Sequence, residues 1–270
     1  ACIAAFPGPA FFSTAKELTM YPNLSLLGFS FGTYGICCVI GGALAIWLAI
    51  RNGKRFQQDR FAMLEACVWA LIGGFLGAKL LYLLVSFSDI VEMFQTSGSH
   101  WDTIFSLLEG GFVFYGGLLG GLAALLLYLH HFQLPYGIYL SSITPAVPLA
   151  HAFGRIGCFF AGCCYGIPYD PPIGICLKNA IGTAPTDIPL FPVQLLESGL
   201  DFLLAGLLQL CFRKRTRKID VIPFYCIGYA GIRLFTERFR YDTERGIYFG
   251  LATSEWISLA LAICGVLLLL

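Results

Sequence analysis

The sequence predicts an all-α polytopic membrane protein with about seven transmembrane helices, and three observations support this fold class. Of its 270 residues, 57% are hydrophobic and 12% are charged, whereas about a quarter are charged in an ordinary soluble domain. Apolar stretches of bilayer-spanning length recur along the chain. Clusters of basic residues lie at the ends of two of them. This composition excludes a soluble enzyme and a secreted disulfide scaffold, and it gives no support for nucleic-acid binding.

The elements follow in order from hydropathy. Residues 1–25 are predicted to form an interfacial segment that precedes the first span, and we expect the whole chain, 1–270, to be a single transmembrane domain. The predicted spans are 27–50, 62–87, 112–130, 138–160, 192–212, 221–236 and 251–270.

The orientation follows from the loops between these spans. The junctions 51–60 and 213–218 are rich in Lys and Arg, and such loops stay in the cytoplasm. Seven alternating spans then place the N-terminus outside and the C-terminus in the cytoplasm. The segment 88–111 carries acids and no Lys or Arg, and 163–191 is rich in Pro and Gly. Both are predicted to be outer loops.

Several spans carry ionisable side chains at depths where a charge is costly and normally faces the bundle interior. Glu65 and Asp201 are interpreted as interfacial or structural. Arg155 and Arg233 lie among apolar residues and glycines, and arginine suits a phosphate through its bidentate fork. Together with the arginines that follow the sixth span, they indicate a site for a phospholipid headgroup. Glu237 follows Arg233 by four residues and can position its guanidinium.

The fourth span presents a shared functional face. His151, Arg155 and Cys158 are spaced at i, i+4 and i+7, which places them on one stripe of a helix. Gly154 and Gly157 beside them permit close approach of another backbone or of a lipid chain.

Six ordered segments resemble one family. The segment 151–166, HAFGRIGCFFAGCCYG, resembles the signature of bacterial prolipoprotein diacylglyceryl transferases, a Gly-Arg-(Leu/Ile)-Gly-Asn-Phe segment that leads into a Gly-Glu-x-x-Gly turn. The other five matching segments are Tyr34–Gly35, Gly77–Tyr82, Gly110–Gly117, Pro192–Glu197 and Tyr229–Arg240. The resemblance runs from about residue 28 to 260, and the family's seven-span topology with the N-terminus outside agrees with the charge pattern.

The resemblance implies an activity and its partners. Family members transfer the diacylglyceryl group of phosphatidylglycerol to the thiol of a prolipoprotein lipobox cysteine and release glycerol phosphate. The expected partners are phosphatidylglycerol, membrane lipids and the prolipoprotein signal peptide, and we expect a monomer in the bacterial inner membrane. The resemblance assigns catalysis to Arg155, Arg233, Tyr115, His151 and Cys158. It assigns substrate binding to Tyr34, Lys79, Gly154, Gly157, Gly166, Gln194, Glu197, Glu237 and Arg240.

Three positions depart from the family pattern. Tyr115 stands in place of a His, which removes a base that titrates near neutral pH. Cys158 stands in place of an Asn, and Cys163 in place of a Glu, followed by Cys164. His151 is either a replacement imidazole or a hydrogen-bonded helix histidine.

The cysteines of this segment admit four interpretations. In the first, they are inert packing residues. In the second, Cys163 or Cys164 forms a disulfide with Cys176. In the third, one of them is a catalytic or acceptor thiol, and in the fourth they bind a metal together with His151. The spacing is not that of a zinc knuckle and offers no clear fourth ligand, so the sequence predicts neither a metal nor a cofactor. Two alternative functions also remain open, namely transfer to a different acceptor and phospholipid binding without catalysis.

Overall fold

Helices make up most of the chain in the computed structural model, which describes residues 16–26, 29–96, 101, 104, 107, 113–180, 184–185, 187–214, 221–241 and 247–270. Among these residues, three helices are long and apolar enough to cross a membrane: α1 (Thr33–Lys54), α2 (Arg60–Val85) and α8 (Val193–Lys214). The prediction of a helical membrane protein is therefore confirmed. The chain divides into two compact units, Ala1–Ala49 with Leu140–Leu270, and Ile50–Tyr139. Each unit is described by itself below.

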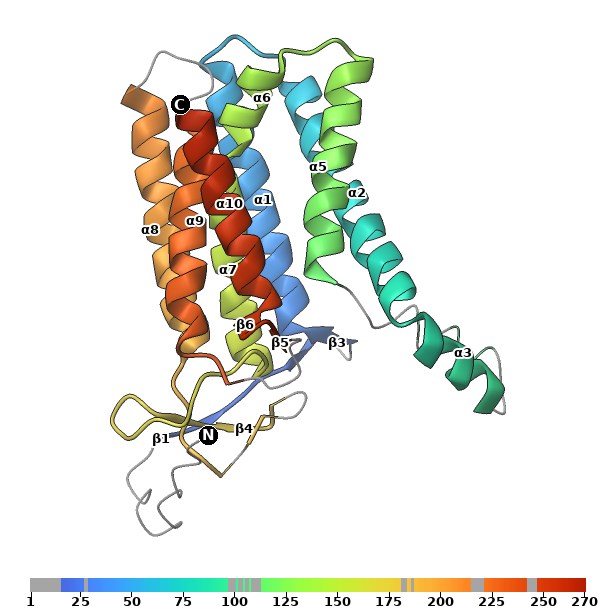
Figure 1. Cartoon of the computed structure of the whole chain (residues 1–270), viewed down its shortest axis with the longest axis vertical. Helices are drawn as coiled ribbons and strands as arrows, with labels where there is room; N and C mark the ends of the chain where they lie inside the picture. The colour runs from blue at the N-terminus through green and yellow to red at the C-terminus, as the bar shows by residue number, and fades with distance from the viewer. Residues whose placement is uncertain are drawn as a thin grey trace. The chain divides into compact units, whose positions relative to one another are not determined.

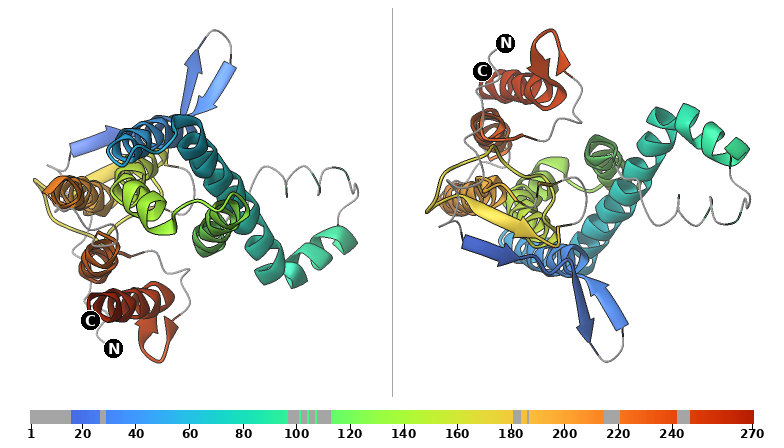
Figure 2. Two further views of the ribbon diagram at one scale, coloured as in Figure 1. Left: turned by 90° about the horizontal axis from the view of Figure 1, so that it is seen from above. Right: turned by 90° about the horizontal axis from the view of Figure 1, so that it is seen from below.

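The first unit is a helix bundle. Here α7 (Ala146–Ala161) packs against α8, α8 packs against α9 (Ile222–Glu237), and α9 packs against α10 (Thr253–Leu269) (Figures 1 and 2). On its other side α7 contacts α1 through a small residue, because a Cβ added to Gly41 would lie 3.2 Å from the carbonyl oxygen of Ala150.

Short strands supplement the predicted all-α fold. Strand β1 (Lys16–Thr19) pairs in parallel with β4 (Ile175–Lys178), and β2 (Asn23–Leu26) pairs antiparallel with β3 (Phe29–Gly32). A third pair joins β5 (Ile247–Tyr248) to β6 (Leu251–Ala252). A hydrophobic cluster anchors β4 to the end of α7; its buried members are Met20, Phe159, Leu177 and Leu190.

Two predicted spans differ from the helices observed. The first begins at Thr33 instead of residue 27, because 29–32 are extended and form β3. The predicted span 138–160 is two helices, α6 (Tyr136–Ile143) and α7. Pro145 lacks a backbone N–H and disfavours helical geometry at Thr144, whose hydroxyl donates to the carbonyl oxygen of Leu140 at 2.7 Å. The other five predicted spans agree with helices to within a few residues.

The loops that the sequence predicted also contain regular structure. The segment 88–111 begins with a helix, α3 (Phe87–Thr96), and 163–191 contains β4. Of the predicted interfacial segment 1–25, the first fifteen residues lie outside the described residues.

In the second unit, α2 and α5 (Phe114–His131) pack antiparallel along glycines. A Cβ on Gly77 would lie 2.8 Å from the Cα of Gly120, and a Cβ on Gly120 would lie equally close to the Cα of Gly77. Small residues on both helices are what allow two membrane helices to approach this closely. On the same pair of helices, the hydroxyl of Tyr128 donates to Glu65 at 2.9 Å.

We expect Gly120→Ala to destabilise the protein. The added methyl group meets backbone atoms of Gly77, at 2.8 Å from its Cα and 3.2 Å from its nitrogen, and overpacking of this kind costs about 1–3 kcal/mol. Gly206→Ala in α8 is the matched control, since nothing lies within 4 Å of its added Cβ. Thermal unfolding in detergent should show a lower Tm for the first variant only. Equal Tm values would contradict the packing described here.

Candidate functional site

Three arginines converge on one buried carboxylate. Glu197, in the second turn of α8, is fully buried. Its Oε1 lies 2.9 Å from a terminal nitrogen of Arg155 on α7 and 3.3 Å from one of Arg233 on α9. Its Oε2 lies 3.4 Å from a terminal nitrogen of Arg240, which follows α9. One carboxylate therefore orients three guanidinium groups that come from three segments of the chain.

A second carboxylate joins this arginine cluster. Glu237 contacts Arg233 at 2.8 Å, one turn along the same helix. Among the described residues, the cluster brings together three guanidinium groups and these two carboxylates. The Nε of Arg155 is buried and has no hydrogen-bond partner among the described residues. The cluster therefore has a donor with which to bind an anionic group.

The loop that follows α7 holds Arg240 in place. The amide of Ile167 donates to the carbonyl oxygen of Phe239 at 2.9 Å, and Gly166 forms a β-bridge with Arg240. A Cβ on Gly166 would lie 2.8 Å from that same carbonyl oxygen. The resemblance assigned Gly166 to substrate binding, and in the structure Gly166 lies against the protein's own backbone.

A second acid–base pair, on α7 and α8, lies one helical turn from the Arg155–Glu197 pair. The Nδ1 of His151 is 2.8 Å from a carboxylate oxygen of Asp201, which is fully buried. The ring of Tyr229 packs edge-on against His151 at 5.4 Å. His151 precedes Arg155 by four residues and Asp201 follows Glu197 by four, so this pair stacks beside the Arg155–Glu197 pair. Sequence reasoning missed Asp201 as the partner of His151, although its spacing from Glu197 was the available signal.

We expect His151 and Asp201 to be strongly coupled in stability. His151→Gln or Asp201→Asn alone leaves a buried polar group without its partner, which costs about 1–3 kcal/mol. The double variant should be less destabilised than the sum of the two single variants, by about 0.5–3 kcal/mol. Urea unfolding of the four proteins measures this coupling. Additive effects would show that the pair does not stabilise the fold.

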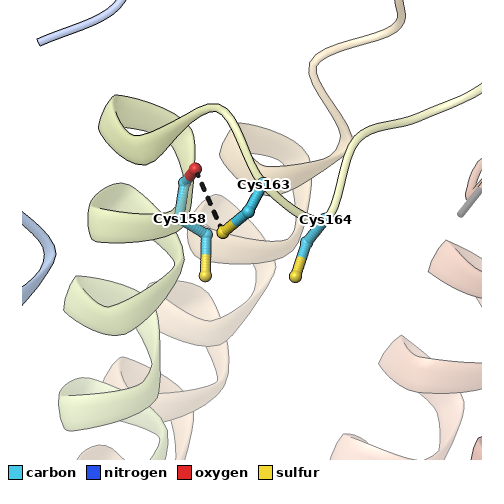
Figure 3. Close-up of side chains that lie close together, drawn as sticks. All are labelled: Cys158, Cys163 and Cys164. Carbon is cyan, nitrogen blue, oxygen red and sulfur yellow. Dashed lines mark hydrogen bonds between the residues drawn. The ribbon is translucent and has the colours of Figure 1, made fainter. Parts of the chain in front are cut away.

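Three thiols gather where α7 ends. Gly162 ends the helix in the left-handed conformation, with φ at 73°, and the amide of Cys163 then donates to the carbonyl oxygen of Cys158 at 3.1 Å. This turn brings the sulfur atoms of Cys158, Cys163 and Cys164 within 4.8 Å of one another (Figure 3). Neither Cys163 nor Cys164 is in a disulfide in the described part of the chain, so the predicted alternative of a disulfide from one of them to Cys176 is not formed.

The electrostatic surroundings favour the anionic form of one thiol. Side-chain hydrogen bonding with Cys158 and Cys163 lowers the pKa of Cys164 below its ordinary value. The nearby positive charges of Arg240 and Arg155 lower it further. The Cys164 thiol is therefore close enough to the arginine cluster to be affected by its positive charge.

Other predicted residues surround these groups. The side-chain amide of Gln194 donates to the carbonyl oxygen of Cys163 at 2.8 Å and so links α8 to the thiol turn. Tyr34 of α1 lies beside Gly157, since a Cβ added to Gly157 would lie 3.0 Å from the ring of Tyr34. Gly154 has open space, because nothing lies within 4 Å of its added Cβ.

Lys79 and Tyr115 belong to the second compact unit, on α2 and α5. The ammonium group of Lys79 donates to the carbonyl oxygen of Leu107 and lies 5.3 Å from the centre of the Tyr82 ring. Tyr115 is the second residue of α5. The roles of both residues in the reaction stay predictions.

The family model for prolipoprotein diacylglyceryl transferases matches residues 22–270. The chain belongs to this family. A phosphatidylglycerol–prolipoprotein diacylglyceryl transferase of Clostridium tetani (strain Massachusetts / E88) is 36% identical over 241 residues, which are 89% of this chain and 93% of the relative. A second relative, phosphatidylglycerol–prolipoprotein diacylglyceryl transferase 2 of Clostridium perfringens (strain 13 / Type A), is 32% identical and covers 90% and 91% of the two chains.

A third such transferase, from Legionella pneumophila (strain Corby), is 31% identical over 259 residues, covering 91% of this chain and 96% of its own. These matches extend over most of each protein, so the similarity is not restricted to the segment around Arg155. The family membership that the sequence motifs predicted is confirmed. Within this diacylglyceryl transferase, the motif residues Arg155, Glu197 and Arg233 form one contiguous cluster.

Proposed function

We propose that this chain transfers the diacylglyceryl group of phosphatidylglycerol to the cysteine thiol of a prolipoprotein. The observation that carries the proposal is the arginine cluster around Glu197, in which the Nε of Arg155 has no hydrogen-bond partner among the described residues. The phosphodiester of phosphatidylglycerol carries one negative charge, and guanidinium groups bind such an anion with charge-assisted hydrogen bonds. The names of the three relatives support the choice of both substrates.

The proposed reaction is a displacement at carbon. The acceptor thiol gives up its proton, which passes through solvent to the released glycerol phosphate. Its sulfur attacks the glyceryl carbon that bears the phosphate ester, and the carbon–oxygen bond breaks. The released glycerol phosphate gains negative charge as it leaves. Arg155 and Arg233 stabilise that developing charge, and Glu197 and Glu237 hold their guanidinium groups in position.

The remaining roles extend this proposal to the other predicted residues. Arg155 and Arg233 act directly on the phosphate, and Tyr115, His151 and Cys158 are the further catalytic candidates. Phospholipid and peptide binding is assigned to Tyr34, Lys79, Gly154, Gly157, Gly166, Gln194, Glu197, Glu237 and Arg240. Within this set, the contact between Tyr34 and Gly157 supports a place for Tyr34 beside the signature helix.

The proposed setting is the bacterial inner membrane. The chain forms a single transmembrane domain that spans the membrane seven times, with its N-terminus outside and its C-terminus in the cytoplasm. The segments 88–111 and 163–191 face outward, and the protein acts as a monomer. The basic junctions 51–60 and 213–218 support this orientation.

A reconstituted transfer assay tests the function. Purified protein in phosphatidylglycerol vesicles is incubated with a lipobox peptide, and mass spectrometry follows the peptide and the released glycerol phosphate. We expect a thioether-linked diacylglyceryl adduct and an equal amount of glycerol phosphate. A peptide with serine in place of the lipobox cysteine is the control. Phosphatidylglycerol binding without any adduct would contradict the proposal and favour a lipid-binding protein.

A further inference from the structure

We propose that Cys158, Cys163 and Cys164 bind a thiophilic d10 metal ion of the Zn²⁺ class and leave its fourth coordination position open to an exogenous thiol. The identity of that thiol, the acceptor cysteine, rests on the proposed function. The metal site itself rests on the geometry of the three side chains, their burial and the charges around them.

The sulfur positions fit such an ion. They all lie within 4.8 Å of one another, and thiolates around a tetrahedral Zn²⁺ with bonds of about 2.3 Å are about 3.8 Å apart. Small rotations of the side chains close this difference. Cys158 is buried and the other two thiols are partly buried, so the ion would be largely shielded from water. When the ion binds, three sulfur–metal bonds form, and the proton of each sulfur that is still a thiol passes to solvent.

The chain around the thiols is fixed in the conformation that gathers them. The left-handed turn at Gly162 is closely packed, since an added Cβ would lie 2.8 Å from the Cα of Ala180. Cys164 also has a positive φ, 57°, a backbone conformation that is strained for a residue with a side chain. Gln194 holds the carbonyl group of Cys163 at 2.8 Å. Backbone strain that the surrounding structure holds in place, like that at Cys164, is typical of a functional site.

The local charge favours thiolate ligands. Three thiolates around a divalent ion carry one net negative charge, and Arg155 lies three residues before Cys158, on the same face of α7. A positively charged microenvironment is what distinguishes reactive and metal-binding cysteines from inert buried ones.

The fourth position is open among the described residues. No further histidine, cysteine or carboxylate atom in the described ranges joins the three sulfurs. His151, the ligand considered from sequence, is bound to Asp201 at 2.8 Å and lies two helical turns, about 10 Å, before Cys158. Structural zinc sites are closed by four protein ligands, whereas catalytic sites keep one position for a substrate.

An open position gives the bound ion a role in the proposed transfer. A thiol that coordinates the ion is deprotonated outright, and the thiolate is the form that attacks carbon. The sulfur–metal bond then breaks as the sulfur–carbon bond forms and the phosphate ester leaves, with no change in oxidation state. This activation would replace the base that is absent where Tyr115 stands in place of the family histidine.

Cobalt titration of the full-length protein in detergent tests the metal site. The protein is reduced, freed of metal with a chelator and titrated with Co²⁺ under anaerobic conditions. We expect one equivalent to bind, with a sulfur-to-cobalt charge-transfer band that disappears when Zn²⁺ is added. Cys163→Ser and Cys164→Ser should weaken Co²⁺ binding at least 100-fold. Cys211→Ser and Cys264→Ser, whose cysteines lie outside the cluster, are the matched controls and should bind normally.

Variants that lose binding are checked by thermal unfolding. Cys164→Asn is a second variant at this position. It removes the thiol without adding backbone strain, because asparagine tolerates a positive φ. A metal-free protein that binds no Co²⁺, or a triple variant at Cys158, Cys163 and Cys164 that still binds it, would overturn the metal site.

Adding the lipobox peptide to the cobalt protein tests the open position. A peptide with a free thiol should change the cobalt spectrum, and the serine peptide should not. Unchanged spectra with both peptides, or full transfer activity after metal removal, would overturn thiol binding at the ion. Cobalt binding with the thiol-dependent spectral change, but without any lipid transfer, would instead contradict the proposed function and leave the metal site standing.

Discussion

Arg155→Ala should lower the rate of diacylglyceryl transfer by about 10²–10³, the range measured when one preorganised donor to a developing negative charge is removed. Arg155 is held by Glu197 at 2.9 Å, and its buried Nε has no partner among the described residues. Its guanidinium is thus already oriented before an anionic group arrives, so it requires no reorganisation when the phosphate ester leaves.

Arg213→Ala is the matched arginine control for this prediction. Arg213 is exposed near the end of α8, about 24 Å along the helix from Glu197 at 1.5 Å per residue. The measurement is the initial rate of adduct formation by mass spectrometry. Arg155→Lys keeps the charge but loses the fork, so it should recover only part of the rate. A rate for Arg155→Ala equal to that of the control would contradict the assignment of Arg155 to the phosphate.

Glu197→Gln should lower the stability of the protein more than Gly120→Ala, His151→Gln or Asp201→Asn. Glu197 is fully buried and contacts Arg155, Arg233 and Arg240. Glutamine keeps the shape but removes the charge, and breaking a buried ion pair by removing one partner costs about 3–5 kcal/mol. The three guanidinium groups would then repel one another, with the Glu237 carboxylate still beside Arg233, so transfer activity should also be lost.

Thermal and urea unfolding in detergent measure this effect. Glu65→Gln is the control, since Glu65 is an exposed glutamate on α2 whose carboxylate accepts one hydrogen bond from Tyr128. Its substitution should change stability by less than about 1 kcal/mol. Should Glu197→Gln unfold at the same temperature as Glu65→Gln, the buried carboxylate would not be what holds the three arginines together.

The sequence predicted the larger features of the fold because they depend on composition and local pattern. Five of the seven predicted spans coincide with helices to within a few residues, since a membrane helix satisfies its own backbone and needs only a long apolar stretch. Hydropathy misplaced the start of α1 and missed the break at Pro145. The extended segment 29–32 is fixed by pairing with Asn23–Leu26, a contact that hydropathy does not report.

For the candidate site, the sequence by itself selected the candidate residues. Ordered motifs identified the family and selected Arg155, Glu197 and Arg233, because charged side chains in apolar segments are rarely accidental. Helical spacing also placed His151 and Cys158 on the same face as Arg155.

Only the tertiary structure decided how these residues pair. Glu197 proved to be the shared partner of three arginines, Asp201 the partner of His151, and Cys158 a close neighbour of Cys163 and Cys164. These contacts join α7, α8 and the segment after α9, which are separated in sequence by many residues. Sequence spacing fixes neighbours along one helix, whereas contacts between helices depend on how their faces pack, and that packing is set by the whole bundle.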